Sequence, residues 1–268
     1  MAQILSIVLS FRNEEEVIPE LIRRLREVLK NECAKQTISN YELIFVNDAS
    51  TDRSLELLMN AAKKNKDIKI INMSRNFGVA PCVLAGMQYA KGNVLVYMDA
   101  DLQDPPELIP EMLRVYREQK IDVVHTIRKS REGESRLKLL ITKLGYFILK
   151  KVSSVDIPPE AGDFKLLSRR VVDHLIQLKE DKPFIRSLIS WIGFKQTTIE
   201  YHREKRFAGK AKFPILGKKV ISNFLNSALI SFSDVPLKLV SLMGFLVSIG
   251  AFLYLIYITI HKFLCHNN

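Results

Sequence analysis

The chain has 268 residues, of which 47% are hydrophobic and 26% are charged, and its formal net charge is +11. This length suits one large α/β domain with an appendage. Its three cysteines are far apart and form no CxxC pair, which argues against a disulfide framework or a thiolate zinc site and favours a reducing, cytoplasmic location.

Short apolar runs alternate with longer amphipathic stretches over the first 127 residues, which is typical of a mostly parallel α/β sheet covered by helices. We predict strands at Ile4–Ser10, Tyr41–Asn47, Ile68–Asn72, Val94–Met98 and Val123–Ile127. We predict helices at Pro19–Lys30, Ser54–Lys64, Val79–Tyr89 and Pro106–Glu118. In the first helix Leu21, Leu25, Val28 and Leu29 share one face at helical spacing.

Two amphipathic stretches follow. Glu134–Val152 fits a helix lying on a membrane or, equally well, a helix packed on the protein's own core. For Ile215–Ile230 the membrane is favoured, because its apolar face leads directly into the most apolar part of the chain.

That part, Leu239–Ile260, has no charged residue and would reach about 33 Å as a helix, enough to cross a membrane. The alternative is a buried core helix. The N-terminus has no basic leader and runs into Glu14, Glu15 and Glu16, so we expect no secretion signal there.

The positive charge is concentrated just before this apolar stretch. Residues 126–219 hold 22 Lys and Arg against 10 Asp and Glu, whereas residues 1–125 hold 16 against 18. Anionic lipids attract such charge, which also marks the cytoplasmic side of a membrane. Because no nucleic-acid-binding motif accompanies the charge, we expect membrane lipids and no nucleic acid as partners.

Ligands of parallel α/β sheets bind beyond the carboxyl ends of the strands. Three predicted strand ends are rich in polar residues, namely SFRNE at 10–14, NDASTD at 47–52 and DADLQD at 99–104. In the second, Asp48 is placed to accept hydrogen bonds from a nucleobase, whereas Ser50 and Asp52 are expected to cap the helix that begins near Ser54.

The third strand end carries the most specific signal. Asp99 and Asp101 are separated by one small residue, so both carboxylates can reach a hard cation such as Mg²⁺ or Mn²⁺, which accepts substrate phosphates in its other positions. Such a metal offsets charge on a departing diphosphate. The alternative is an acidic loop that only caps the helix at Pro106, a role to which we expect Asp104 to contribute.

The segments SFRNEEE, VNDASTDRS and MDADLQDPPE together resemble glycosyltransferase family 2 with the GT-A fold. The elements REGES at 131–135, AGDFKLLSRR at 161–170 and RFAGKAKF at 206–213 narrow the resemblance to the polyprenyl-phosphate glycosyltransferases, which include dolichyl-phosphate mannose synthases and bactoprenol glucosyltransferases. The six motifs occur in order and cover nearly the whole chain. The resemblance implies a Rossmann-like, mostly parallel sheet flanked by helices.

The resemblance also implies roles for individual residues. The nucleotide-binding residues would be Ser10, Arg12, Glu14, Asp48 and Asp99. The ligands of Mg²⁺ or Mn²⁺ would be Asp99, Asp101 and Gln103. The acceptor and phosphate-binding residues would be Arg128, Arg131, Arg206 and Lys212, although each basic residue could instead be solvated at a membrane surface. Asp101 and Asp163 would be catalytic, with Asp163 facing the acceptor as a base or a positioning group.

We therefore expect an inverting, metal-dependent hexosyltransferase. Its donor would be a nucleotide sugar, most simply UDP-glucose, and its acceptor undecaprenyl or another polyprenyl phosphate, in the making of a cell-envelope polysaccharide. A lipid phosphate is already an anion at neutral pH, so its attack needs stabilised charge more than a general base. Two alternatives remain open, a transferase that extends a saccharide and a catalytically silent nucleotide-binding membrane scaffold.

The chain departs from the family pattern at Ser10, Arg12, Ala49 and Ala211, where proline, tyrosine, glycine and serine are common. Only HKFLCHNN follows the apolar stretch, where bacterial relatives usually continue to a second membrane helix. If oligomers of these relatives form through that helix pair, homo-oligomer formation by this chain is in question. We predict a cytoplasmic catalytic domain at 1–213, an amphipathic juxtamembrane segment at 214–236 and a single C-terminal membrane anchor at 237–261.

Overall fold

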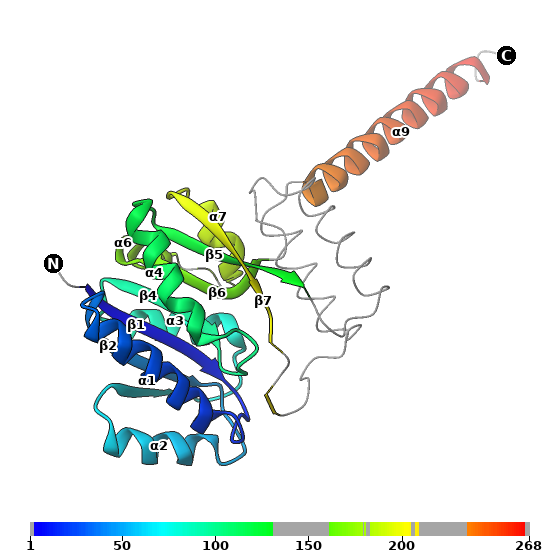
Figure 1. Cartoon of the computed structure of the whole chain (residues 1–268). Coiled ribbons are helices and arrows are strands. Elements are labelled where there is room, and N and C mark those ends of the chain that lie inside the picture. The colour runs from blue at the N-terminus through cyan, green and yellow to red at the C-terminus, as the bar shows by residue number, and fades with distance from the viewer. Residues whose placement is uncertain are drawn as a thin grey trace.

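The fold is described from a computed structural model (Figure 1). It describes residues 3–130, 161–178, 180, 183–204, 207–208 and 235–265. The two amphipathic stretches at 134–152 and 215–230 lie outside these residues, so both alternatives for the first and the membrane placement of the second stay predictions.

A seven-stranded sheet forms the centre of the domain, with the strand order β3-β2-β1-β4-β6-β5-β7 (Figure 1). The strands are β1 Gln3–Phe11, β2 Ile38–Asn47, β3 Ile68–Asn72, β4 Val94–Asp99, β5 Val123–Ser130, β6 Ala161–Ser168 and β7 Gln196–His202. Strands β1 to β4 are parallel to one another, as is β7 to β5. The predicted mostly parallel α/β sheet is confirmed.

Strand β6 is antiparallel to both of its neighbours, β4 and β5, and neither β6 nor β7 was predicted. Phe164 and Leu166 of β6 face one hydrophobic cluster, but Asp163 and Lys165 stand at the alternate positions, where a buried strand is usually apolar. These two charged residues therefore obscure the strand in the sequence.

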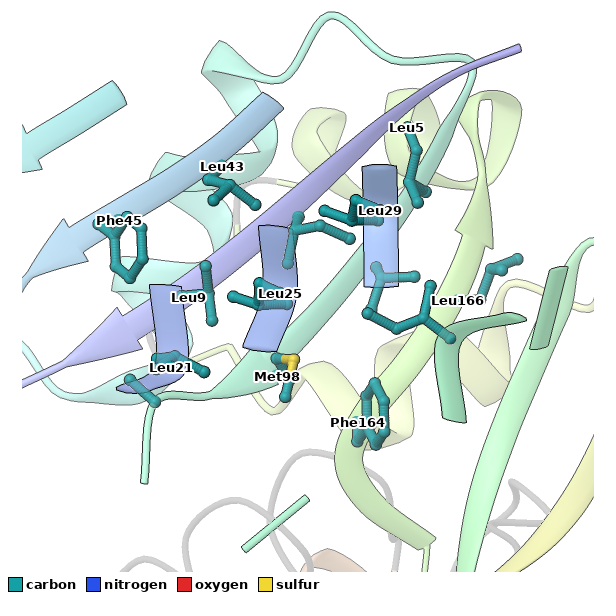
Figure 2. Packing of buried hydrophobic residues seen from close by; sticks show 14 of the residues in the cluster. Leu5, Leu9, Leu21, Leu25, Leu29, Leu43, Phe45, Met98, Phe164 and Leu166 are labelled. Atoms are coloured by element: carbon teal, nitrogen blue, oxygen red, sulfur yellow. The ribbon is translucent and has the colours of Figure 1, made fainter. Parts of the chain in front are cut away.

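Helices cover both faces of the sheet. They are α1 Ile18–Ala34, α2 Ser54–Lys64, α3 Val79–Tyr89, the 3₁₀ turn η1 Pro106–Leu108, α4 Ile109–Glu118, α6 Arg169–Gln177 and α7 Ile185–Trp191. One cluster lies beneath α1, α2 and α4, and the other beneath α3, α6 and α7. Leu21, Leu25 and Leu29 of α1 are fully buried against Leu9, Leu5 and other residues of the sheet, as the helical spacing predicted (Figure 2).

Helix α9, Val235–Cys265, projects away from the sheet in Figure 1. Within it Leu237–Lys262 is long and apolar enough to cross a membrane, and none of its most apolar stretch is buried against the rest of the protein. Leaving so many large apolar side chains in water would be costly, which is the physical ground for a membrane anchor here.

Candidate active site

The loops that follow β1 and β2 interlock at the carboxyl edge of the sheet. The Asn13 side chain bridges to Thr51, accepting from the Thr51 backbone N–H at 2.8 Å and donating to its hydroxyl at 3.2 Å. The Asn13 N–H donates to the Ser50 hydroxyl at 3.0 Å. The Glu14 N–H donates to the Ser54 hydroxyl at 2.8 Å, and the Glu14 side chain is buried. These bonds join the polar ends of β1 and β2, two of the three predicted polar strand ends, into one rim.

Two of the predicted helix-capping residues behave differently from each other. Asp52 accepts from the Ser54 backbone N–H at 3.0 Å at the start of α2, although the cap position itself is occupied by Arg53. The prediction for Ser50 was wrong, because its hydroxyl faces the first loop and accepts from Asn13 instead.

Asp48 holds the loop that precedes α3. Its carboxylate accepts hydrogen bonds from the Asn76 side-chain amide at 2.5 Å, the Phe77 N–H at 2.7 Å and the Gly78 N–H at 3.0 Å. The Arg75 guanidinium lies 4.2 Å from the centre of the Phe77 ring. Asp48 thus fixes the start of α3, and the loop that it holds brings the Phe77 ring to the same edge of the sheet.

The acidic turn after β4 is held from both sides. In the sheet register Ser10 lies opposite Asp99. The Asp101 carboxylate accepts from the Gln103 N–H at 3.1 Å, which closes the turn over Leu102, a residue in the left-handed region with φ of 56°. The Gln103 carbonyl accepts from the Glu204 N–H at 3.0 Å, so the segment after β7 fastens the turn from outside.

Asp104 was predicted to help cap the helix at Pro106, and that prediction was wrong. The residue at the cap position is Pro105, and the buried Asp104 carboxylate points instead to the end of β7, where it accepts from the Tyr201 hydroxyl. The guanidinium groups of Arg128 and Arg203 lie 3.7 and 3.6 Å from its oxygens. A fully buried carboxylate is stabilised more by positively charged partners than by capping a helix, because its negative charge must be compensated.

Asp163 of β6 enters the same region next to Asp99. Tyr97 and Lys165 are opposite each other across β4 and β6, and continuing this antiparallel register by two residues sets Asp99 opposite Asp163. Arg186 of α7 binds the Asp163 carboxylate with two N–H groups, one of them at 2.7 Å. Strand β6 thus brings the Asp163 carboxylate, to which Arg186 of α7 is bound, to the acidic turn.

The clustered carboxylates differ in the direction in which their pKa values are shifted. Burial raises the pKa of Asp99 to about 8, and the negative charges of Asp163, Asp101 and Asp104 add to the shift. Burial also acts to raise the pKa of Asp163, but Arg186 outweighs it, so this pKa lies below its ordinary value. The result is an ionised, arginine-paired carboxylate beside one that holds a proton until a cation or a base removes it.

The donor set fits a divalent cation that is shared with a substrate. Among the residues that the structure describes, no three His, Cys, Asp or Glu side chains are arranged to hold a metal by themselves. Asp99 and Asp101 offer two carboxylates, and Mg²⁺-type sites commonly use one or two carboxylates and take the remaining ligands from phosphates and water.

Of the predicted phosphate-binding residues, the structure describes Arg128 and places it on β5 beside this group. Its Nε donates to the Tyr201 hydroxyl at 3.2 Å. The guanidinium lies flat against Gly162, where an added Cβ would come within 3.0 Å of it. Arg131, Arg206 and Lys212 lie outside the described residues.

Three residues of the site were not foreseen from the sequence, namely Arg186, Tyr201 and Arg203. Arg186 stands alone in a helix after a stretch with no motif, and only the fold brings it to Asp163. Tyr201 lies near the end of the unpredicted strand β7 and Arg203 directly follows it, so recognising that strand would have placed both at a carboxyl edge.

A hollow of about 610 Å³ lies at the opposite, amino edge of the sheet, with Gln3, Asn93, Arg117 and Lys120 in its lining. Its Asp122 is already bound by Arg170. The carboxyl strand ends therefore remain the candidate site, because Asp99, Asp101, Asp104 and Asp163 gather there.

The sequence profile of Glycosyl transferase family 2 matches residues 6–176, a stretch that includes all three polar strand ends and the Asp163 strand. The chain belongs to glycosyltransferase family 2. It is a glycosyltransferase, as the resemblance implied.

Similar proteins agree with this family membership. An uncharacterised glycosyltransferase of Bacillus subtilis (strain 168) is 46% identical over 250 residues, which is 93% of this chain and 75% of that protein. The bactoprenol glucosyl transferase of Shigella phage SfV is 33% identical over 252 residues, which is 93% of this chain and 78% of that protein.

The fold is the GT-A fold. Among solved structures, the glucosyl-3-phosphoglycerate synthase of Mycobacterium tuberculosis, in complex with Mn²⁺, UDP and glucosyl-3-phosphoglycerate, matches with a TM-score of 0.53 at 17% identity. The match covers 84% of this chain and 80% of that one.

Proposed function

We propose that this glycosyltransferase moves a hexose, in the first instance glucose from UDP-glucose, onto a polyprenyl phosphate such as undecaprenyl phosphate. The catalytic domain would lie on the cytoplasmic face of the membrane, with α9 as its anchor. The observation that carries the proposal is that one chain combines the Asp99–Asp101 turn with an apolar helix fit for a membrane. The similarity to a bactoprenol glucosyl transferase over 93% of the chain supports the choice of acceptor.

On the donor side, the interlocked loops would bind the nucleoside. Asp48 has acceptor capacity for a base N–H, and Ser10, Arg12 and Glu14 line the adjoining loop. Asp99, Asp101 and Gln103 would hold Mg²⁺ or Mn²⁺ together with the diphosphate. When bound, this cation supplies positive charge against the departing nucleotide. The bond between Glu204 and Gln103 keeps the turn in place for that purpose.

On the acceptor side, Arg128 and Arg186 provide positive charge close to the carboxylates. Arg131, Arg206 and Lys212 would add to it. An attacking lipid phosphate is already ionised, so Asp163 need not take a proton, and its two-pronged pairing with Arg186 suits a positioning role better than that of a base. The phosphate oxygen attacks the anomeric carbon as the bond to the nucleotide breaks, which inverts the configuration.

A donor panel tests the proposal. Membranes containing the full chain are incubated with polyprenyl phosphate, radiolabelled UDP- or GDP-sugars, and either Mn²⁺ or a chelator. We expect label in the lipid phase with a UDP-hexose and Mn²⁺, and none with the chelator. Label that appears only in water-soluble saccharide would refute the lipid acceptor in favour of a transferase that extends saccharides.

The variant Asp101→Asn separates an enzyme from a silent scaffold. We expect it to fold and remain in the membrane while lipid-linked product falls by about a thousandfold, because one of two metal-binding carboxylates is lost. Activity equal to that of the wild type would exclude the metal role of Asp101. A wild-type chain that binds UDP but transfers no sugar would favour the scaffold.

A further inference from the structure

A row of polar side chains lies inside the sheet domain under α7, next to the acidic turn but not part of it. Tyr97, Lys165 and His125 stand opposite one another across β4, β6 and β5. The relative exposure of each is 1% or less. They point to the face covered by α3, α6 and α7, because Leu95 and Leu167, two residues away on the same strands, belong to that cluster.

The row is poorly satisfied by hydrogen bonds. Among the residues that the structure describes, the Tyr97 hydroxyl, the Lys165 ammonium and His125 Nδ1 have no hydrogen-bond partner, and neither does the hydroxyl of Ser187, which α7 places in the buried interior. A buried amine without a hydrogen bond destabilises a fold by several kcal/mol, and methionine would fill its space without that cost. Lys165 is therefore expensive as a packing residue.

The surroundings of Lys165 give it one electrostatic partner. Asp163 is two residues away on the same strand and therefore on the same face. The negative charge of Asp163 favours the protonated form of Lys165, while burial lowers the pKa of the amine to about 7. His125 is neutral, because burial lowers the pKa of its imidazole to about 3. Of the three side chains in the row, Lys165 is therefore the one whose positive charge a nearby carboxylate favours.

We propose that Lys165 is a positioning residue of the transfer site, which shares the α7-covered face of β6 with Asp163 and, together with Arg186, keeps this carboxylate fixed beside Asp99. Arg186 binds Asp163 from α7, and Lys165 follows Asp163 by two residues on the same face of the strand. If the Lys165 ammonium is removed, one positive charge fewer offsets the repulsion between Asp163 and the carboxylates of Asp99, Asp101 and Asp104. The inference rests on the proposed function, since Asp163 is taken to face the acceptor.

The test compares Lys165→Met, Lys165→Arg and the matched control Ser187→Ala in the full chain. The control removes the buried Ser187 hydroxyl of α7, which also has no hydrogen-bond partner among the described residues, but it leaves the charge of Lys165 intact. Thermal unfolding in detergent is measured first, followed by kcat and by KM for the donor and for the polyprenyl phosphate.

For Lys165→Met we expect an unfolding midpoint equal to or above that of the wild type, a kcat lower by about tenfold or more, and a donor KM within about twofold. Lys165→Arg keeps the charge and should restore kcat to within about threefold of the wild type, and Ser187→Ala should match the wild type. If Lys165→Met does not fold, Lys165→Gln replaces it with the same expectation.

A kcat for the neutral variants within about twofold of the wild type overturns the inference, as does a folded Lys165→Arg variant that is as slow as Lys165→Met. In both cases the wild type still transfers sugar, so the proposed function stands. A wild type that transfers sugar to no polyprenyl phosphate contradicts the proposed function itself.

Discussion

Replacing Asp99 by asparagine should make the protein more stable, and the gain should grow with pH. Burial, together with Asp163, Asp101 and Asp104, raises the pKa of Asp99 to about 8 from an ordinary value of 3.8. Asparagine has the same shape and cannot ionise. The variant therefore removes the repulsion while leaving the packing of the turn unchanged.

The sign follows from proton binding. Between the unfolded pKa of 3.8 and the folded pKa of about 8, the native state keeps a proton that the unfolded chain has lost. The free energy of unfolding of the wild type therefore falls as pH rises through this window, by at most about 1.4 kcal/mol per pH unit. From pH 5.5 to 7.5 the limit is about 2.7 kcal/mol. Because Asp99 is partly exposed and shares its proton with neighbouring carboxylates, we expect about 1 to 1.5 kcal/mol.

Urea unfolding of the full chain in detergent, followed by circular dichroism at pH 5.5, 6.5 and 7.5 with a chelator present, measures this difference. Asp173→Asn is the control, because Asp173 is an exposed aspartate on α6 outside the carboxylate group. Mn²⁺ with UDP should then stabilise the wild type and not Asp99→Asn. Stability curves for Asp99→Asn and the wild type that stay parallel across this pH range would refute the reasoning.

Three further substitutions test other parts of the site and fold. Ala49→Gly should raise the free energy of unfolding by about 0.5 to 1 kcal/mol in thermal or urea unfolding, because Ala49 has a φ of 53° that glycine adopts without strain; a loss of stability would contradict this. Gly162→Ala should displace the Arg128 guanidinium, because the added Cβ would lie too close to it. The KM for polyprenyl phosphate should then rise by about fivefold or more, while the KM for the donor stays unchanged. Equal changes in both KM values would argue against a role of Arg128 in acceptor binding. Glu42→Ala should cost about 2 to 3 kcal/mol in urea unfolding, because this buried carboxylate accepts from the Ser6 hydroxyl and the Lys91 N–H, both at 2.6 Å; a loss below about 0.5 kcal/mol would show that water replaces it.

The donor half of the site could be predicted from the sequence because its signals are local. Each of its strands ends in a run of polar residues, and parallel strands bring their carboxyl ends to one edge. The register that sets Ser10 opposite Asp99 follows directly from that pattern. The predicted bounds of α2, α3 and β3 also agree with the structure, since apolar periodicity and Ser54 mark them clearly.

The part of the site that we propose for the acceptor depends on contacts between distant residues, which no local pattern reveals. Arg186 meets Asp163 only because β6 enters the sheet antiparallel, and charged residues at two inward positions disguised that strand. Asp104 was misassigned for the same reason, since its partner Tyr201 is 97 residues away along the chain.

The antiparallel strand has one more consequence, for how such enzymes diversify. Strand β5 ends at Ser130 and β6 begins at Ala161, and Ile127 and Ala161 are paired across these two strands. The strands that carry Arg128 and Asp163 are therefore neighbours in one sheet, about 5 Å apart in the hydrogen-bonding direction. The position of Asp163 relative to Asp99 is set by the pairing of β6 with β4, and not by the length of the segment that joins β5 to β6. Related enzymes can therefore differ in that segment while the sheet keeps the two carboxylates at the same separation.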